Sequence, residues 1–399
     1  MACVAAADPL SKAAPVPTAI RVETISDYQA FLDLEPVWNE VAEAAGLDHP
    51  FLEHAWVRTW WECFGVGSSL RILVLKADAQ TVAIAPLILT PIRMWGIKVR
   101  RLGFFYNAHV PRADFLIAQR REEAYRAIWS HLSGSHDWDL LQLCQLPEGS
   151  ETLEAIPGLA GPDHCKIVTW LSGASPYVPL SASWGAYFDS LAAKHRANLR
   201  NRSKRLNGIG PVEVETITGG EKLTDALEAG LQLEAAAWKG EARTAISCDP
   251  DISKFYATFA QRAAERGWMR LNFLHTGAQR VAFDYSLSYK NRIHLLKIGY
   301  DPTYAPYSPS NLLLFMVLQD AFERDAREYD LLGESADWKL NWTRHSRPHY
   351  WLFVFSCTFK GHLLHFIKAQ LVPFLKRSGL QPLRKLVLRL AACVQAQRG

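Results

Sequence analysis

The chain lacks the patterns that mark membrane-spanning, secreted and zinc-binding proteins. No stretch approaches the roughly 18 consecutive apolar residues that a membrane helix needs. The seven cysteines are scattered without a Cys-x-x-Cys pair or a Cys/His zinc spacing, so we expect reduced thiols and no bound metal. Residues 1–19 have neither a basic start nor an apolar core, which predicts a disordered leader instead of a signal peptide, and a cytoplasmic protein.

Several common catalytic motifs are also absent. The sequence has no Gly-x-Ser-x-Gly nucleophile elbow, no phosphate-binding P-loop and no complete dinucleotide glycine fingerprint. These absences argue against an esterase, a nucleoside triphosphatase and a dehydrogenase of the Rossmann type.

Acidic residues are missing beyond Asp337, whereas eleven Lys and Arg residues follow it. The segment from 338 onward has a formal charge of +11, and since the whole chain has +4, the preceding residues carry −7. Within this segment, 359–394 combines helix-spaced apolar residues with cations and is interrupted at Pro373 and Gly379. Two interpretations stay open: short amphipathic helices on the inner face of an anionic membrane (360–399), or a C-terminal helix packed on the body with solvated cations.

The chain contains enough material for two folded domains. Its 399 residues, of which 49% are apolar and 21% charged, are typical of a globular protein with more than one core. Fourteen tryptophans are mostly expected in the core, although aromatic rings also line long hydrophobic clefts.

Periodicity predicts two successive α/β units separated by a proline-rich loop at 147–180. The first unit is expected to contain strands at 21–25, 70–77, 80–90, 98–104, 113–117 and 138–145, and helices at 26–46, 49–65 and 120–133. The second is expected to contain helices at 183–207, 220–238, 251–266 and 309–326, strands at 211–217, 328–332 and 350–356, and a hairpin over 268–298 that turns at 275–277. The similar order suggests a duplication at the level of the fold.

Residues 293–342 carry the most informative local pattern. An apolar strand at 293–300 is followed by a Ser-Pro helix start, a second apolar strand and Asp-Trp-Lys. Polar side chains stand at the breaks between these elements: Tyr300, Asp301, Ser308, Glu334, Asp337 and Lys339. This order would bring together a phosphate-bearing cofactor and a reacting amine.

The run 194–206 (KHRANLRNRSKRL) concentrates cations on a predicted helix. Nucleic-acid binding is one interpretation. Cations directed at the phosphates of a cofactor or substrate explain the run as well, and because the body is net acidic we expect no nucleic-acid partner.

Six segments in order resemble the CelD-like (cellulose-biosynthesis) branch of the GNAT acyltransferases. They are the aromatic helix 51–64, the strand 83–89 (AIAPLIL), the block 107–114 (NAHVPRAD), the basic run 194–206, and the stretches 299–314 (GYDPTYAPYSPSNLLL) and 329–342 (YDLLGESADWKLNW). The resemblance spans about residues 20–358 and extends to the Fem-type aminoacyl transferases of peptidoglycan assembly.

This resemblance implies an α/β (α+β) fold with tandem GNAT-like domains, in which mixed central sheets are flanked by helices. The expected domains are 20–175 and 176–358, followed by basic amphipathic helices over 359–399. The implied reaction is transfer of an acyl group from a thioester to an amine or hydroxyl.

The resemblance also implies where the donor binds. In a GNAT-like site two parallel strands separate around the thioester carbonyl, and the pyrophosphate contacts backbone N–H groups at the start of the next helix. The expected donor-binding residues are Tyr300, Ser308, Ser310 and Asn311, with Arg196 and Arg200. Because Ser-Pro-Ser-Asn stands where ordinary GNAT enzymes have glycines, the co-substrate stays open between acyl-CoA, an acyl carrier protein and an aminoacyl-tRNA.

Acyl transfer to an amine needs a neutral nucleophile, a base for its proton and a donor to the oxyanion, but no covalent enzyme intermediate. The candidate catalytic side chains are His109, Asp114, Glu334, Asp337 and Lys339. The candidate acceptor-site residues are Asn107, Glu234, Trp238 and Asp301, and Glu234 is also a candidate base. His109 and Asp114 spell the His-x₄-Asp motif of glycerolipid acyltransferases, but such a spacing is common by chance.

The sequence therefore predicts an N- or O-acyltransferase acting on a cell-envelope component. Candidate acceptors are an exopolysaccharide sugar, a peptidoglycan precursor or an amino lipid such as a sphingoid base. A Fem-like transferase that uses aminoacyl-tRNA, and a non-catalytic GNAT-like scaffold of polysaccharide or lipid assembly, are the alternatives.

Overall fold

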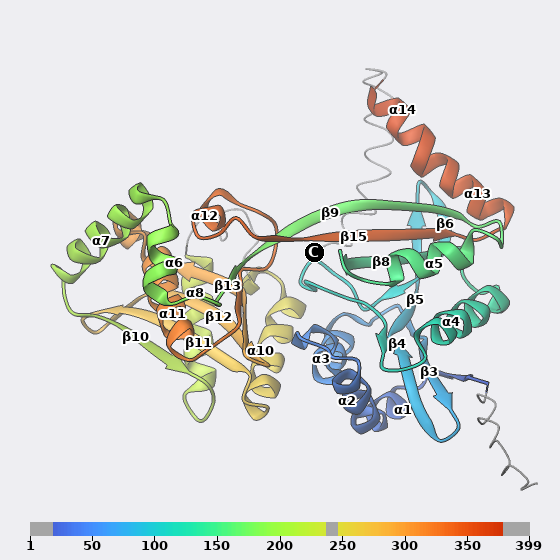
Figure 1. The fold of residues 1–399 in the computed structure, drawn as a ribbon, viewed down its shortest axis with the longest axis horizontal. Helices are drawn as coiled ribbons and strands as arrows, with labels where there is room; N and C mark the ends of the chain where they lie inside the picture. The colour runs from blue at the N-terminus through green and yellow to red at the C-terminus, as the bar shows by residue number, and fades with distance from the viewer. Residues whose placement is uncertain (1–18, 237–245, 378–399) are drawn as a thin grey trace, which may run out of the picture.

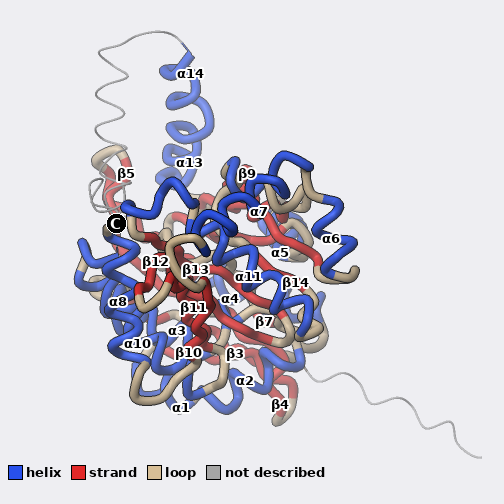
Figure 2. Tube along the Cα trace, turned by 90° about the vertical axis from the view of Figure 1, so that its left-hand side faces the viewer, coloured by secondary structure: helices blue, strands red, loops and turns tan. Residues whose placement is uncertain are grey.

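A computed structural model describes residues 19–236 and 246–377, which form two lobes joined by two long strands, β9 (Lys166–Pro179) and β15 (Ser346–Phe355) (Figure 1). The N-terminal lobe lies on the right of Figure 1 and the C-terminal lobe on the left. Both lobes consist of sheets flanked by helices, as Figure 2 shows from the side. The predicted mixed α/β class is therefore confirmed.

The N-terminal lobe is built from short helices around two sets of strands. Its elements are β1 (Arg21–Ile25), α1 (Tyr28–Asp33), α2 (Glu35–Ala44), η1 (Pro50–Leu52), α3 (His54–Phe64), β2 (Ser69–Leu70), β3 (Ile72–Ala77), β4 (Gln80–Ala85), β5 (Leu87–Met94), β6 (Ile97–Phe104), β7 (Leu116–Ile117), α4 (Arg121–Ser135), β8 (Leu140–Pro147) and α5 (Thr152–Ala160).

The C-terminal lobe follows β9 and ends at β15. Its elements are α6 (Trp184–Ser190), α7 (Ala193–Asn207), β10 (Val212–Ile217), α8 (Leu223–Ala235), η2 (Ile246–Cys248), α10 (Pro250–Glu265), β11 (Met269–Thr276), β12 (Gln279–Tyr289), β13 (Arg292–Tyr300), η3 (Pro302–Tyr307), α11 (Pro309–Glu323), β14 (Glu328–Asp330) and α12 (Asp337–Leu340). A last helical segment comprises α13 (Phe359–Phe366), the π-helical η4 (Ile367–Leu371) and α14 (Val372–Arg377).

One sheet runs through both lobes. It has eleven strands in the order β10-β11-β12-β13-β14-β9-β15-β8-β6-β5-β2, while a separate four-stranded sheet in the N-terminal lobe has the order β1-β3-β4-β7. Strand β9 pairs with β15 over residues 166–176 and then with β14 over residues 177–179. Strand β15 lies between β9 and β8, so the chain returns to the N-terminal lobe after completing the C-terminal lobe.

The prediction of a loop over 147–180 is wrong. This stretch contains α5 and β9, the strand that enters both halves of the large sheet. The prediction counted prolines as breakers, but Pro176 and Pro179 lie where β9 leaves the β15 ladder and passes to β14. Proline is tolerated in a strand where its nitrogen is not needed for the ladder.

Two predicted helices are each split into two shorter helices, and the predicted hairpin contains a third strand. The helix predicted at 26–46 is split at Leu34, because Pro36 in the first turn of α2 favours a new helix start. The helix predicted at 183–207 is split into α6 and α7 by an extended residue, Leu191. The hairpin over 268–298 is a three-stranded meander, whose second turn places Lys290 and Asn291 at positive φ, as a two-residue type I′ turn requires.

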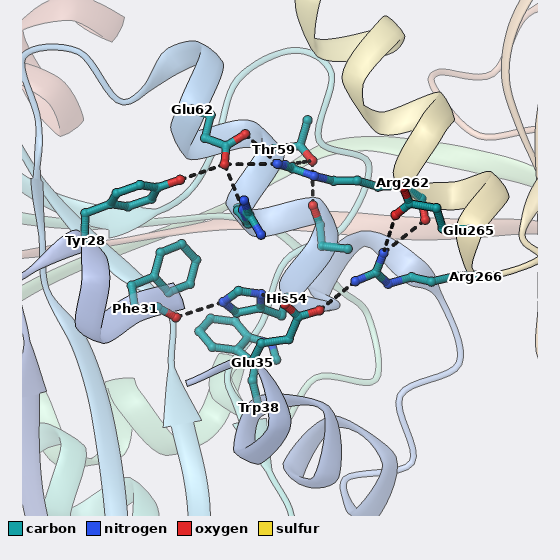
Figure 3. Close-up of polar contacts among 12 residues, drawn as sticks. Tyr28, Phe31, Glu35, Trp38, His54, Thr59, Glu62, Arg262, Glu265 and Arg266 are labelled. Carbon is teal, nitrogen blue, oxygen red and sulfur yellow. Dashed lines mark hydrogen bonds and ion pairs between the residues drawn. The ribbon is translucent and has the colours of Figure 1, made fainter. Parts of the chain in front are cut away.

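A continuous apolar core fixes the two lobes to each other through α3 and α10. The ring of Trp56 on α3 packs edge-on against Phe255 and Phe259 of α10, at centroid distances of 5.1 and 4.7 Å. Polar contacts frame this packing (Figure 3): Arg262 donates to Thr59 Oγ1 and pairs with Glu62, both on α3.

Replacing Trp56 with Ala is expected to lower the free energy of unfolding by about 3–5 kcal/mol, because the buried indole leaves a cavity at the joint between the lobes. Chemical denaturation measures the change. Phe359→Ala is the matched control, since this ring is 86% exposed and its loss should change stability by less than about 0.5 kcal/mol. Equal effects of the two substitutions would contradict this account of the lobe interface.

Candidate functional site

Two cavities lie on opposite faces of β13. The larger, about 470 Å³, opens between the lobes and is lined by Leu296 and Lys297 of β13, by the 106–111 loop of the N-terminal lobe and by β9 and β15. The smaller, about 190 Å³, lies against the start of α11 and is lined by Leu295 and Ile298. One strand therefore forms part of the wall of both cavities.

A β-bulge explains how four consecutive residues divide in this way. Tyr285 of β12 pairs with Lys297 and Ser286 pairs with Leu295, which leaves Leu296 as an extra residue. In a regular strand side chains alternate, so Leu295 and Lys297 would share a face. The extra residue reverses the alternation, and Leu296 and Lys297 face the larger cavity while their neighbours face the smaller.

The two parallel strands β13 and β14 are paired over a short distance only. Their register covers Arg292–His294 against Glu328–Asp330, and β13 continues to Tyr300 without β14 beside it. The bulge lies just beyond the last paired residue. The strands thus separate at the point where the two cavities approach each other.

The smaller cavity contains three of the predicted donor-binding residues, Tyr300, Ser310 and Asn311. Asn311 Oδ1 accepts a hydrogen bond from Trp342 Nε1 at 3.3 Å, which orients the side chain. Ser308, in the left-handed conformation, is the N-cap of the 15-residue helix α11, and its carbonyl accepts from the N–H groups of Asn311 and Leu312. Asp301 Oδ1 accepts from Thr303 N, so it caps η3 and does not line either cavity.

The basic helix α7 packs beside η3 and α11. Its two predicted residues are engaged elsewhere, because Arg196 pairs with Asp189 and Arg200 lies over the ring of Phe188. The exposed Arg205 lies 5.1 Å from the ring centre of Tyr307, the last residue of η3. Arg205 belongs to the predicted basic run 194–206 but was not among the named donor-binding residues, and it lies beside η3.

His109 and Lys297 meet in the larger cavity, although they come from different lobes. His109 Nδ1 lies 3.2 Å from the hydroxyl of Tyr256 and 3.4 Å from Lys297 Nζ. Burial, and then the Lys297 ammonium, lower the pKa of His109 to about 3, so the imidazole is neutral near pH 7. Burial also raises the pKa of Tyr256 well above its usual value, so the phenol stays protonated.

Glu334 also lines the larger cavity, at the end of a turn that Lys339 holds. Leu332 and Gly333 both have positive φ, and the carbonyls of Leu332 and Glu334 accept hydrogen bonds from Lys339 Nζ. Burial lowers the pKa of Lys339 to about 8, while Asp330 and Glu334 oppose this shift. Lys339 itself lines neither cavity, so it positions the turn that carries Glu334.

Comparison with known proteins agrees with this geometry. Residues 193–340 match the family described as Acetyltransferase (GNAT) domain. This segment resembles a GNAT domain. The predicted resemblance to GNAT acyltransferases is therefore confirmed, and so is the tandem GNAT-like fold class, while no curated protein sequence matches the chain.

Three solved structures share the fold over most of their length. FemX has 12% identity and a TM-score of 0.56, and the match covers 83% of this chain and 98% of that chain. The C-terminal domain of a putative lysylphosphatidylglycerol synthetase from Agrobacterium fabrum has 12% identity, coverage of 86% and 97% and a TM-score of 0.51. L-PGS from Bacillus licheniformis has 12% identity, coverage of 84% and 95% and a TM-score of 0.51. These likenesses establish the fold.

Two candidate carboxylates, Asp337 and Asp114, line neither of the two cavities. Asp337 is exposed at the first position of α12. Asp114 accepts hydrogen bonds from Thr152 Oγ1 and Phe115 N, and thereby fixes the start of α5. It shares the 107–114 block with His109 but not the cavity.

The remaining predicted residues have structural contacts or cannot be placed. Asn107 Oδ1 accepts from His109 N at 3.0 Å and shapes the loop that presents His109. Glu234 is buried on α8, where its carboxylate accepts a hydrogen bond from Ile246 N. The backbone of Glu234 lies close to β13 at Gly299, where a side chain would collide with it. Trp238 lies outside the described residues. Within residues 19–236 and 246–377, no group of His, Cys, Asp or Glu side chains is arranged to hold a metal ion.

The sequence missed several polar residues of the larger cavity. Ser175 of β9 and His349 of β15 are joined by a 3.0 Å hydrogen bond between Oγ and Nε2, and Gln145 and Tyr106 lie nearby on the cavity wall. Burial lowers the pKa of His349 to about 4, which makes it a weak base. No local motif marks these residues, because strand pairing across the two lobes brings them together.

The pKa of Lys339 predicts a specific dependence of stability on pH. Between about pH 8 and pH 10.5, Lys339 is neutral in the folded protein but still protonated in the unfolded chain, so the free energy of unfolding rises with pH. The gain is on the order of 3 kcal/mol over this interval. Denaturation at several pH values should show this rise in the wild type relative to Lys339→Met, which has no titrating group there. Parallel curves for the two proteins would show that the pKa is not lowered.

Proposed function

We propose that the protein is a GNAT-type acyltransferase that moves an acyl group from a thioester donor to an amine or hydroxyl of a cell-envelope component. The observation that carries this proposal is the division of β13 between two cavities at the point where it separates from β14. The thioester would lie between the separated strands. The rest of the donor would extend toward α11, and the acceptor would approach from the lobe interface.

The donor side suits a phosphate-bearing thioester. The start of α11 offers the backbone N–H of Ser310 and the positive end of a 15-residue helix, and Pro309 near its first turn costs no hydrogen bond. Apolar residues such as Leu295 and Leu313 dominate the small cavity and suit an acyl or pantetheine chain. Exposed cations of α7, including Arg205, suit a donor with further negative charge, either coenzyme A or an acyl carrier protein.

On the acceptor side, Glu334 is the best-placed base. An acceptor ammonium in the larger cavity would give one proton to this carboxylate, and the neutral amine would then attack the thioester carbon. Attack forms the new C–N bond and a tetrahedral intermediate, whose collapse breaks the C–S bond. The thiolate takes up one of the two protons left on the nitrogen, and the other stays on the product nitrogen. Lys297, which lies beside the bulge and lines the larger cavity, would stabilise the oxyanion of the intermediate.

A second donor class, an aminoacyl-tRNA, has one observation in its favour. The basic helix α7 presents Lys204 and Arg205 to solvent beside η3, which suits a polyanion larger than a coenzyme. The fold shared with FemX and with the putative lysylphosphatidylglycerol synthetase domain supports an envelope acceptor without distinguishing the donors.

Thiol release from acyl-CoA or acyl carrier protein, measured with an amine or hydroxyl acceptor, tests the proposal. Glu334→Gln should lower kcat by about 10²–10⁴-fold with a smaller effect on KM, because the acceptor can still bind but loses its base. Asp337→Asn is the matched control and should stay near the wild-type rate, since Asp337 lies outside both cavities.

Two results would contradict the proposal. The first is no acceptor-dependent thiol release with either thioester donor, combined with aminoacyl transfer from a charged tRNA, which would favour the second donor class. The second is no transfer from any of the three donors, which would leave a non-catalytic scaffold.

A further inference from the structure

The helical segment α13–η4–α14 is fixed to the body by one face only. Leu364 is fully buried, and Gly361 lies so close to Ser356 that a side chain would collide with its backbone. Thr358 caps the helix start, and Lys360 pairs with Asp139 at 2.6 Å. These contacts determine which side of the helix faces away from the protein.

The opposite face is apolar, and nothing within residues 19–236 and 246–377 covers it. Phe359, Phe366 and Phe374 are 86%, 49% and 63% exposed, and Leu363 and Leu371 lie between them at helical spacing. Figures 1 and 2 show this segment rising out of the body next to β9 and β15. A row of exposed large apolar side chains on an anchored helix is unusual for a surface that only contacts water.

The helical segment also contacts the wall of the larger cavity. Lys368 Nζ of η4 lies 4.1 Å from the ring centre of Trp170 on β9. Trp170 and its neighbour Leu171 are exposed, and both line the larger cavity. Through Lys368, the helical segment thus contacts an exposed residue that lines the cavity where the acceptor would enter.

Charge indicates which partner covers this face. Residues 360–399 contain eight Lys and Arg and no Asp or Glu, so the segment complements an anionic surface. Aromatic and leucine side chains on one helix face together with neighbouring cations are the composition of helices that lie in the interface of an anionic bilayer. Among the described residues, no helix is long and apolar enough to cross a bilayer.

We propose that the outer face of α13–α14, together with Trp170 and Leu171, docks on an anionic membrane, and that the acceptor is the amine or hydroxyl head group of a membrane lipid. The first half of this proposal is independent of catalysis, whereas the second rests on the proposed acyltransferase function. Docking brings the cavity mouth to the lipid surface, so that a head group can enter while its chains remain in the bilayer.

Flotation of the full chain with vesicles tests the docking surface. Binding is expected to vesicles of equal parts phosphatidylglycerol and phosphatidylcholine, to be much weaker with phosphatidylcholine alone, and to fall with added salt. The triple variant Phe359→Ser/Phe366→Ser/Phe374→Ser should bind at least about tenfold more weakly. The control Val66→Ser/Ile209→Ser, which removes exposed apolar side chains from other elements, should bind like the wild type.

Acyl transfer then tests the acceptor class. The triple variant should acylate a long-chain amine such as sphinganine in the same vesicles more slowly than the wild type, by a factor similar to its loss of binding. Both proteins should acylate the water-soluble 2-amino-1,3-propanediol equally, because none of the three phenylalanines lines either cavity.

The outcomes separate the two proposals. Vesicle binding without turnover of any acceptor would contradict the acyltransferase function and leave the docking surface standing. Turnover of the soluble amine without vesicle binding would overturn the docking proposal alone. A dimer that becomes a monomer in the triple variant, as measured by light scattering, would also overturn it, because a second copy would then cover the face.

Discussion

The pairing of β9 with β15 is the constraint on which the rest of the structure depends. Ten residues of β15 pair with β9, and the end of β9 then pairs with β14, so one ladder joins the sheets of both lobes. The two strands are far apart in sequence, and their pairing closes the C-terminal lobe back onto the N-terminal lobe. Without it, the packing of α3 against α10 would be the main remaining connection between the lobes.

This ladder also forms one wall of the larger cavity. Residues 170–175 of β9 and His349 and Trp351 of β15 face it, opposite the β13 bulge. Because hydrogen-bonded strands resist deformation better than loops, the acceptor side of the site has a rigid wall. The turn that carries Glu334 is not part of this ladder. Lys339 stabilises this turn by donating hydrogen bonds to the carbonyls of Leu332 and Glu334. Lys339 thus contributes to the site without facing either cavity.

How much of the site could be predicted depends on how local its signals are. The predicted donor-binding residues Tyr300, Ser310 and Asn311 stand at a strand end and a helix start, which the sequence marks with Ser-Pro, and they line one cavity. Lys297 could not be selected, because regular alternation places it with Leu295 and only the bulge turns it to the other face.

The long-range contacts escaped prediction for a different reason. His109 and Tyr256, like Ser175 and His349, are brought together by packing between segments more than 140 residues apart. Because the prolines of 147–180 were interpreted as breakers, β9, the strand that links the lobes, was not predicted. Asp337 was selected for its position in a family-like motif, yet the turn directs Glu334 and not Asp337 to the cavity.

The most direct test of the central claim is a crystal structure with a bisubstrate analogue, in which an amine acceptor is joined covalently to the acyl group of coenzyme A. The account predicts that the pantetheine arm lies between β13 and α11 and the acceptor in the larger cavity. The acceptor nitrogen should then be about 2.6–3.2 Å from a Glu334 carboxylate oxygen. An analogue with both portions on the same face of β13, or with its nitrogen remote from Glu334, would contradict the account.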